Sequence, residues 1–235
     1  MRESQLTQIA KLAYHIAQQT PPTYTHPKSR HDYTLPQRLA CIPLKIYCNY
    51  TYREIEERFP ATDQVRQTLQ LTRVPDHATR YRTFAKLSQQ QWQPLNDALL
   101  QHLQVNEMTV AVDTTGFRND TASAYYQSRC GRKRRSWHKG GFVVGTASQL
   151  IVGMRVGRGP GSDAKWSAPL RAQARRYVVR KGRSARLWLL ADAGFDGRDG
   201  EWTDVVPPIR RGGRLRAWSR VLRAALVERA KASGL

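Results

Sequence analysis

Two aspartates follow apolar runs typical of buried strands. Asp113 ends MTVAVD (108–113) and is followed by Thr-Thr-Gly-Phe, and Asp192 ends ARLWLLAD (185–192) and is followed by Ala-Gly-Phe. If the two strands are neighbours, both carboxylates emerge at the same end of a sheet. Two ionised carboxylates about 4 Å apart repel each other unless a cation lies between them. Mg²⁺ prefers such oxygen ligands and leaves room for substrate phosphate, so the pair predicts metal-dependent phosphoryl transfer.

A simpler interpretation also fits each aspartate. Asp113 could cap a loop, and Asp192 could cap the helix that follows it. For either residue alone, capping is the preferred interpretation. The two matching turns, taken together in a basic part of the chain, favour the metal site.

The charge of the chain indicates a polyanionic partner. The 235 residues carry a formal net charge of +21, with a pI near 10.7. Residues 1–105 contain 13 Lys or Arg and 8 Asp or Glu, a net +5, whereas the rest contain 26 and 10, a net +16. Such an excess points to a polyanion, most often nucleic acid. A ribosomal-type protein is the alternative, and the strand-end acid pair argues against it.

Cysteine usage and hydropathy predict the compartment. The three cysteines, Cys41, Cys48 and Cys130, form no CxxC pair, so we expect reduced thiols and a cytoplasmic location. The N-terminal segment lacks a continuous apolar region, so no signal peptide is expected. No run approaches the roughly 18 apolar residues of a membrane span, so no membrane partner is expected.

Residues 1–105 read as an all-helical, DNA-binding-like domain. We expect helices around 9–16, over 35–48 with a kink or break at Pro43, after a Thr51–Glu54 capping box, after a cap at Asp76, and over 88–104. The short helices suit a helix-turn-helix-like unit whose last helix contacts DNA. Its basic residues are Arg80, Arg82 and Lys86. A plain helical bundle with a solvated basic face fits equally well.

Residues 106–235 alternate between strand and helix patterns. The strand at 108–113 precedes an antiparallel pair within 136–159, with its turn near Ala147–Gln149. A basic amphipathic helix follows at 162–182, with Asp163 as its cap. The strand at 185–192 and a short strand in DVVPPI complete the pattern. The expected fold class is therefore mixed α+β, with helices first and then a mixed five-stranded sheet flanked by helices.

Several motifs, taken in order, resemble a known family. DTTGF, SAYYQSRCGRKRRSWHKGGFVV, RGPGSDA, ADAGFD and PPIRR resemble the DDE transposases of prokaryotic insertion sequences. TYREIEERF and VPDHATRYRT resemble the helical region ahead of their catalytic core, and the resemblance covers about residues 34–212. It implies a ribonuclease-H-like core with an Asp-Asp-Glu triad that binds Mg²⁺ or Mn²⁺, and the first two acids correspond to Asp113 and Asp192.

The resemblance also implies partners and a reaction. The partners would be DNA, both transposon ends and target, and a second copy of the chain in a homodimer. Water would cleave a strand at the transposon end, and the freed 3′-hydroxyl would then attack the target DNA.

The third acid departs from the family pattern. The family places its glutamate on a helix well after the fifth strand, and Glu228 is the only acid after Asp204 in this sequence. We expect that the chain stops before the true glutamate segment, as a truncated or frameshifted copy would, with Glu228 as the weaker candidate. The alternative function is a catalytically inactive transposase remnant that only binds DNA.

Basic residues near the acid pair are candidate phosphate contacts. In RCGRKRRSWHKG these are Arg132, Lys133, Arg134, Arg135 and Lys139, and after the fifth strand they are Arg210 and Arg211. A solvated loop is the usual alternative for such a charge run. Trp137 could stack on a base or belong to the core, and His138 is expected to be a packed or surface residue.

Overall fold

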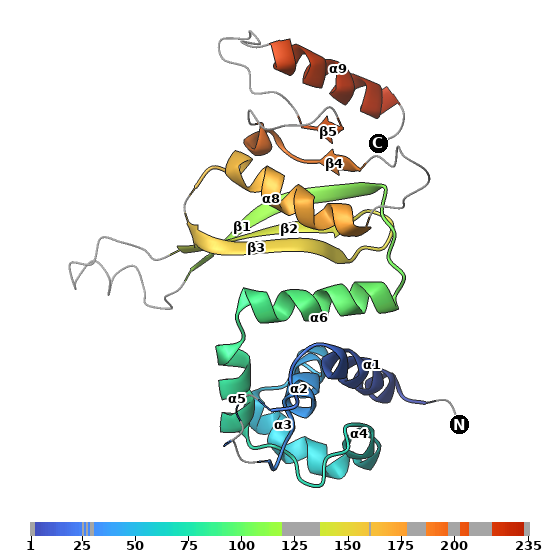
Figure 1. The fold of residues 1–235 in the computed structure, drawn as a ribbon, viewed down its shortest axis with the longest axis vertical. Coiled ribbons are helices and arrows are strands. Elements are labelled where there is room, and N and C mark those ends of the chain that lie inside the picture. The colour runs from blue at the N-terminus through green and yellow to red at the C-terminus, as the bar shows by residue number, and fades with distance from the viewer. Residues whose placement is uncertain are drawn as a thin grey trace, which may run out of the picture. The chain divides into compact units, whose positions relative to one another are not determined.

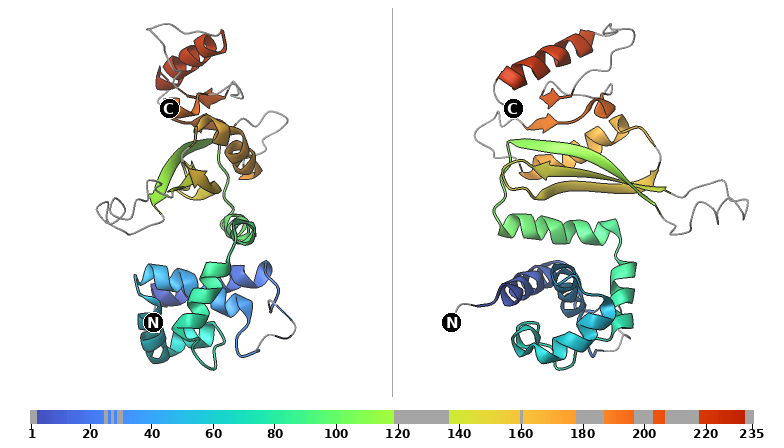
Figure 2. Two further views of the ribbon diagram at one scale, coloured as in Figure 1. Left: turned by 90° about the vertical axis from the view of Figure 1, so that its left-hand side faces the viewer. Right: turned by 180° about the vertical axis from the view of Figure 1, so that it is seen from behind.

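The computed structural model describes residues 3–24, 26, 28, 31–118, 137–159, 161–177, 187–196, 203–206 and 218–232. The chain divides into two compact units, a helical unit (Met1–Leu103) and a sheet unit (Gln104–Leu235). The boundary lies two residues before the predicted one. Each unit is shown in Figures 1 and 2. The fold class is mixed α+β, with helices followed by a mixed sheet.

The helical unit consists of short helices with well-defined caps. Its elements are α1 (Gln5–Gln19), α2 (Leu35–Tyr47), α3 (Tyr52–Arg58), η1 (Phe59–Ala61), α4 (Asp63–Thr68), α5 (His77–Lys86) and α6 (Gln89–His102). The predicted Thr51–Glu54 capping box is confirmed, because each residue's side chain accepts a hydrogen bond from the other's backbone N–H. The predicted cap of α5 is also confirmed, since Asp76 accepts from the Thr79 N–H at 2.7 Å. Local hydrogen bonds therefore fix where these helices begin.

Pro43 does not interrupt α2. The helix was expected over 35–48 and runs without a break from Leu35 to Tyr47, with Pro43 inside it. Proline removes one intrahelical hydrogen bond, which weakens the helix locally. Leu39, Ile42 and Leu44 are buried on either side of it. Burial of these side chains against α1 and its neighbours offsets the lost bond.

The sheet unit is built on β1 (Thr109–Arg118), β2 (Trp137–Gly145), β3 (Ile151–Gly159), β4 (Trp188–Leu190) and β5 (Asp204–Val205). The order across the sheet is β3-β2-β1-β4-β5. β1 is antiparallel to β2 and β2 to β3, whereas β4 lies parallel to β1 and β5 parallel to β4. The predicted antiparallel pair with its turn near residues 147–149 is confirmed. β5 contains only two residues.

One face of the antiparallel strands is covered by α8 (Ala164–Ala174), which contacts β1, β2 and β3 (Figures 1 and 2). Val110, Val112 and Val143 on the strands are buried, as is Leu170 on the helix. A 3₁₀ turn, η2 (Arg175–Tyr177), continues α8, and α9 (Trp218–Ala232) contacts β5. The helix was expected over 162–182, of which residues 178–182 lie outside the described residues.

Glu107 anchors the sheet at the turn between β2 and β3. Its side chain is fully buried, and its carboxylate accepts hydrogen bonds from the backbone N–H of Ser148 at 2.8 Å and of Ala147 at 3.3 Å. A buried carboxylate is costly unless such donors satisfy it. The contact joins the start of β1 to a turn about 40 residues later, so it fixes where the hairpin sits.

Candidate active site

Asp113 and Asp192 occupy corresponding positions on neighbouring segments. In the parallel pairing of β1 and β4, Ala111 lies opposite Leu190. Asp113 and Asp192 each follow that pair by two residues. Paired strands lie about 4.8 Å apart, so both aspartates follow the same end of the paired part of β1 and β4. The prediction that their strands are adjacent is confirmed, and a metal shell shared by the two carboxylates stays a prediction.

The prediction that the first strand ends at Asp113 was wrong. β1 continues to Arg118, and beyond Ala111 it pairs only with β2. The antiparallel hairpin supplies hydrogen bonds that a strand ending at Asp113 would lack. Among the described residues, Asp113 therefore lies just past the point where the pairing of β1 with β4 ends.

Each aspartate also makes the local contact that the capping interpretation expected. Asp113 Oδ1 accepts from the Thr114 N–H at 2.7 Å. Asp192 caps η4 (Ala193–Phe195), and its Oδ1 accepts from the Gly194 N–H at 3.0 Å. Both side chains are exposed. A carboxylate has about four lone-pair sites, so these bonds orient the two groups and leave capacity for a cation.

Asp163 is the residue of this region that the sequence assigned to another role. It occupies the N-cap position of α8, yet its side chain makes no capping hydrogen bond. Its Oδ1 instead accepts from the Thr114 hydroxyl and forms an ion pair with Lys139. Partial burial alone would raise the pKa of this carboxyl. The hydrogen bonds from Lys139 and Thr114 and the charge of Lys139 outweigh burial and lower the pKa.

Gly194 brings the Asp192 turn against Asp163. A Cβ added to Gly194 would lie 2.9 Å from Asp163 Oδ2 and 3.1 Å from Asp192 Oδ1. Real side chains do not fit at the shorter of these separations, so glycine allows the two carboxylates to approach the same backbone position. The Gly in ADAGFD was visible in the sequence, but its neighbour 31 residues earlier was not.

Lys139, a predicted DNA contact, forms an ion pair within the sheet unit. Its side chain is only 13% exposed and pairs with Asp163. The same ammonium donates to the Gly161 carbonyl and lies 5.8 Å from the centre of the Trp166 ring. Asp163 thus neutralises Lys139 within the protein, because β2 directs this side chain toward the α8 side of the sheet.

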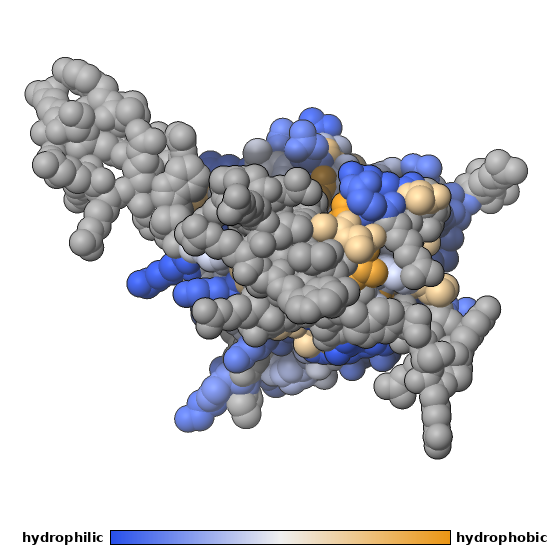
Figure 3. Space-filling view, turned by 90° about the horizontal axis from the view of Figure 1, so that it is seen from above, coloured by the Kyte–Doolittle hydropathy of each residue, from blue (hydrophilic) through white to orange (hydrophobic). Residues whose placement is uncertain are grey.

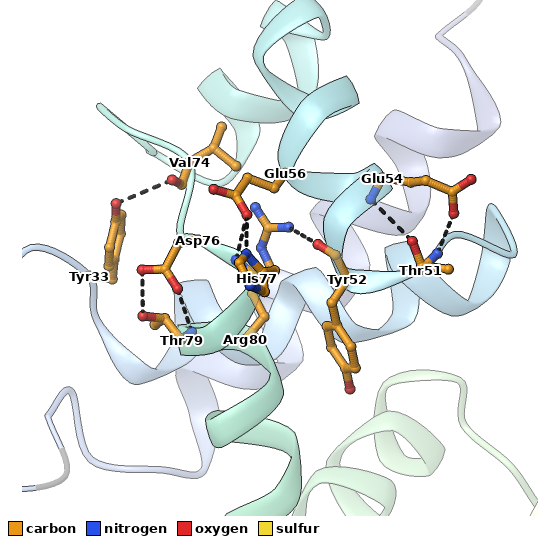
Figure 4. A network of polar contacts seen from close by, with 10 residues as sticks. All are labelled: Tyr33, Thr51, Tyr52, Glu54, Glu56, Val74, Asp76, His77, Thr79 and Arg80. Atoms are coloured by element: carbon orange, nitrogen blue, oxygen red, sulfur yellow. Dashed lines mark hydrogen bonds and ion pairs between the residues drawn. The ribbon is translucent and has the colours of Figure 1, made fainter.

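Arg80 was also assigned to DNA, and it is buried. Its residue is 1% exposed, and one guanidinium nitrogen donates to the Tyr52 carbonyl at 3.4 Å (Figure 4). The guanidinium carbon lies 5.8 Å from the centre of the Phe59 ring. Burial lowers the pKa of Arg80. Arg80 therefore contributes to the interior of the helical unit, whereas Arg82 on the same helix is exposed and stays a candidate phosphate contact.

Glu228 lies on α9 and is far from buried. Its side chain is 73% exposed, and Lys231 donates to it at 3.0 Å. In the space-filling view from above Figure 1, both hydrophilic and hydrophobic described residues are visible at the surface (Figure 3). Among the residues that the structure describes, no group of three or more His, Cys, Asp or Glu side chains is arranged to hold a metal ion.

The remaining predicted DNA contacts lie outside the described residues. These are Arg132, Lys133, Arg134 and Arg135 in one segment and Arg210 and Arg211 in another. They stay predictions from the sequence. Within the described part of the chain, no helix has both the length and the apolar composition to cross a membrane. Comparisons with family models, with curated proteins and with solved structures found no match to the chain.

Proposed function

We propose that the chain is an insertion-sequence transposase of the DDE type, which cleaves DNA at transposon ends and transfers the freed strand. The observation that supports the proposal is the parallel register of β1 and β4, in which Asp113 and Asp192 each follow the Ala111–Leu190 pair by two residues. Their oxygen donors suit Mg²⁺ or Mn²⁺. A bound ion would stabilise the charge that develops on the transferred phosphate.

The order of the sheet supports the finer part of the proposal, a ribonuclease-H-like core with five strands. Three antiparallel strands are followed by a helix on one face and then by segments parallel to β1. This order brings the strand of Asp113 beside the strand that precedes Asp192. The net charge of +21 supports DNA as the partner, since phosphate contacts dominate such binding.

A specific observation favours the alternative, a protein that binds DNA without cleaving it. Glu228, the sequence candidate for the third acid, is largely exposed and already paired with Lys231. Two-metal catalysis needs enough anionic ligands to hold both ions against their mutual repulsion. With Asp113 and Asp192 as the two described ligands, we expect one ion to bind and strand cleavage to be weak.

The proposal is tested by Mn²⁺ binding and by strand cleavage on DNA that carries the ends of the insertion sequence that encodes the chain. Asp113→Asn and Asp192→Asn should each lower Mn²⁺ affinity by roughly ten-fold or more, since even supporting residues of metal sites contribute 10–100-fold. Glu57→Gln, an exposed residue of the helical unit, is the charge-matched control and should bind as wild type. Mn²⁺ binding that is unchanged in both aspartate variants would contradict the proposal.

Cleavage separates the two candidate functions. Salt-sensitive DNA binding with little or no cleavage in Mg²⁺ or Mn²⁺ supports the binding-only alternative. Robust cleavage that disappears in Glu228→Gln would instead establish Glu228 as the third acid.

A further inference from the structure

Asp163 connects the three segments that meet at the proposed metal centre. It accepts from Thr114 on β1, the residue next to Asp113, and it pairs with Lys139 on β2. Its other oxygen, Oδ2, lies against Gly194 in the turn that Asp192 caps. A single side chain at the start of α8 therefore contacts the strand of one acid and the turn of the other.

Asp163 lies on the opposite side of β1 from Asp113. Side chains alternate along a strand, and Val110 and Val112 are buried on the side of β1 that α8 covers. Thr114 belongs to that side, which is why it reaches Asp163, and Asp113 belongs to the other. Asp163 would thus act on Asp113 through the backbone of β1 rather than by touching a cation that Asp113 holds.

The ion pair with Lys139 gives Asp163 an electrostatic role as well. Lys139 is a nearly buried ammonium, and a buried charge that loses its partner is strongly unfavourable. If Asp163 were neutral, Lys139 would need another carboxylate, and Asp192 Oδ1 lies 3.1 Å from the same Cβ position at Gly194 that Asp163 Oδ2 approaches to 2.9 Å. Such a pairing would compete directly with a divalent ion for Asp192.

We propose that Asp163 is a positioning residue of the proposed metal centre, which holds the Asp113 strand and the Asp192 turn together and keeps Lys139 from neutralising Asp192. This inference rests on the proposed function. It assigns no catalytic role to Asp163, and it gives Thr114 and Gly194 supporting roles through the same contacts.

The test compares Mn²⁺ affinity in the full chain, followed by electron paramagnetic resonance, with thermal unfolding in the absence of metal. Asp163→Asn keeps the shape of the side chain and removes its charge, so it should lower Mn²⁺ affinity roughly 10–100-fold, as loss of a supporting residue does. The double variant Lys139→Met with Asp163→Asn removes the uncompensated cation and should recover most of that affinity. A merely structural role of Asp163 predicts no such recovery.

Thr114 supplies a second, milder test that does not disturb the ion pair. Thr114→Val should lower Mn²⁺ affinity by less than Asp163→Asn, and Thr114→Ser, which retains the hydroxyl, should bind as wild type. If Asp163→Asn does not fold, Thr114→Val and the double variant carry the test. Wild-type affinity in Thr114→Val, or a double variant that binds no better than Asp163→Asn, would overturn the inference.

The failure of this inference differs from failure of the proposed function. If Asp113→Asn and Asp192→Asn abolish Mn²⁺ binding while Asp163→Asn binds as wild type, only the positioning role is wrong. If wild type binds no Mn²⁺, or if Mn²⁺ affinity is unchanged in Asp113→Asn and Asp192→Asn, both proposals are wrong.

Discussion

The helix starts of the helical unit and the long-range anchors of the sheet unit depend on polar contacts over very different separations along the chain. In the helical unit, three helix starts are held by capping boxes whose partners are three residues apart, as with Thr34 and Gln37. In the sheet unit, Glu107 reaches Ser148 and Thr114 reaches Asp163, across 41 and 49 residues. The caps form with the helices themselves, whereas the long-range bonds require the sheet to be assembled first.

This difference has a consequence for the candidate site. Asp113 and Asp192 depend on the relative placement of β1, α8 and the turn after β4, so their geometry is only as stable as the sheet unit. A defect in a cap of the helical unit should leave the acid pair intact. A defect at Glu107 or Asp163 should move it.

Arg80 makes a long-range contact within the helical unit, and its replacement gives the largest predicted effect on stability. Arg80→Ala removes a long, fully buried side chain and should lower the free energy of unfolding by about 2–4 kcal/mol, the range for large-to-small core changes. Arg80→Met fills most of the volume and removes a desolvated charge, so it should stay within about 1 kcal/mol of wild type. Chemical denaturation of the three proteins measures both values.

Arg82 is the matched control on the same helix. Because it is exposed, Arg82→Ala should change stability by no more than about 0.5 kcal/mol. If it contacts a phosphate, its loss should reduce the salt dependence of DNA binding by about one unit of slope.

Equal destabilisation by Arg80→Met and Arg80→Ala would show that the charge of Arg80, not its volume, holds the helices together.

A smaller effect is expected at the long-range contact of Glu107. A Cβ at Gly145 would lie 2.1 Å from Glu107 Oε1, so Gly145→Ala must displace the carboxylate from the turn amides. We expect a loss of about 1–3 kcal/mol, typical of overpacking in a core. Gly161→Ala is the control, because a Cβ there meets nothing within 4 Å. Equal stability of the two variants would mean that the Glu107 contact does not anchor the sheet.

The contrast between local caps and long-range contacts also explains what could be predicted from the sequence. Capping residues and strand patterns are local signals, so the Thr51 and Asp76 caps, the extent of α2 and the β2–β3 turn were predicted correctly, whereas the expected break at Pro43 was not found. The adjacency of β1 and β4 was inferred from two matching Asp–Gly–Phe turns. The partner of Lys139 could not be predicted, since nothing in SDA distinguishes a capping aspartate from one that faces β1 and β2. Arg80 was missed because its burial depends on how α3 and α5 pack.

The smallest predicted effect tests a single cap of the helical unit. The Asp76 carboxylate accepts hydrogen bonds from the backbone N–H and from the hydroxyl of Thr79 (Figure 4). The bond from the Thr79 N–H is the main reason that the pKa of Asp76 is lowered. Asp76→Ala should cost about 1 kcal/mol at neutral pH, as loss of an N-cap typically does, whereas Asp76→Asn should cost little because asparagine caps equally well.

The pH dependence of this cap has a defined sign. Because the folded pKa of Asp76 lies below the unfolded value of about 3.9, its ionised form stabilises the fold above that pH, and the contribution is lost as the pH falls through the folded pKa. Asparagine does not titrate, so the stability difference between wild type and Asp76→Asn should shift in favour of the variant as the pH falls from 6 to 3. Thermal unfolding across that range measures the difference, with Asp32→Asn, an exposed aspartate of the segment before α2, as the control. A difference that stays constant with pH would show that the Asp76 cap acts through its shape alone.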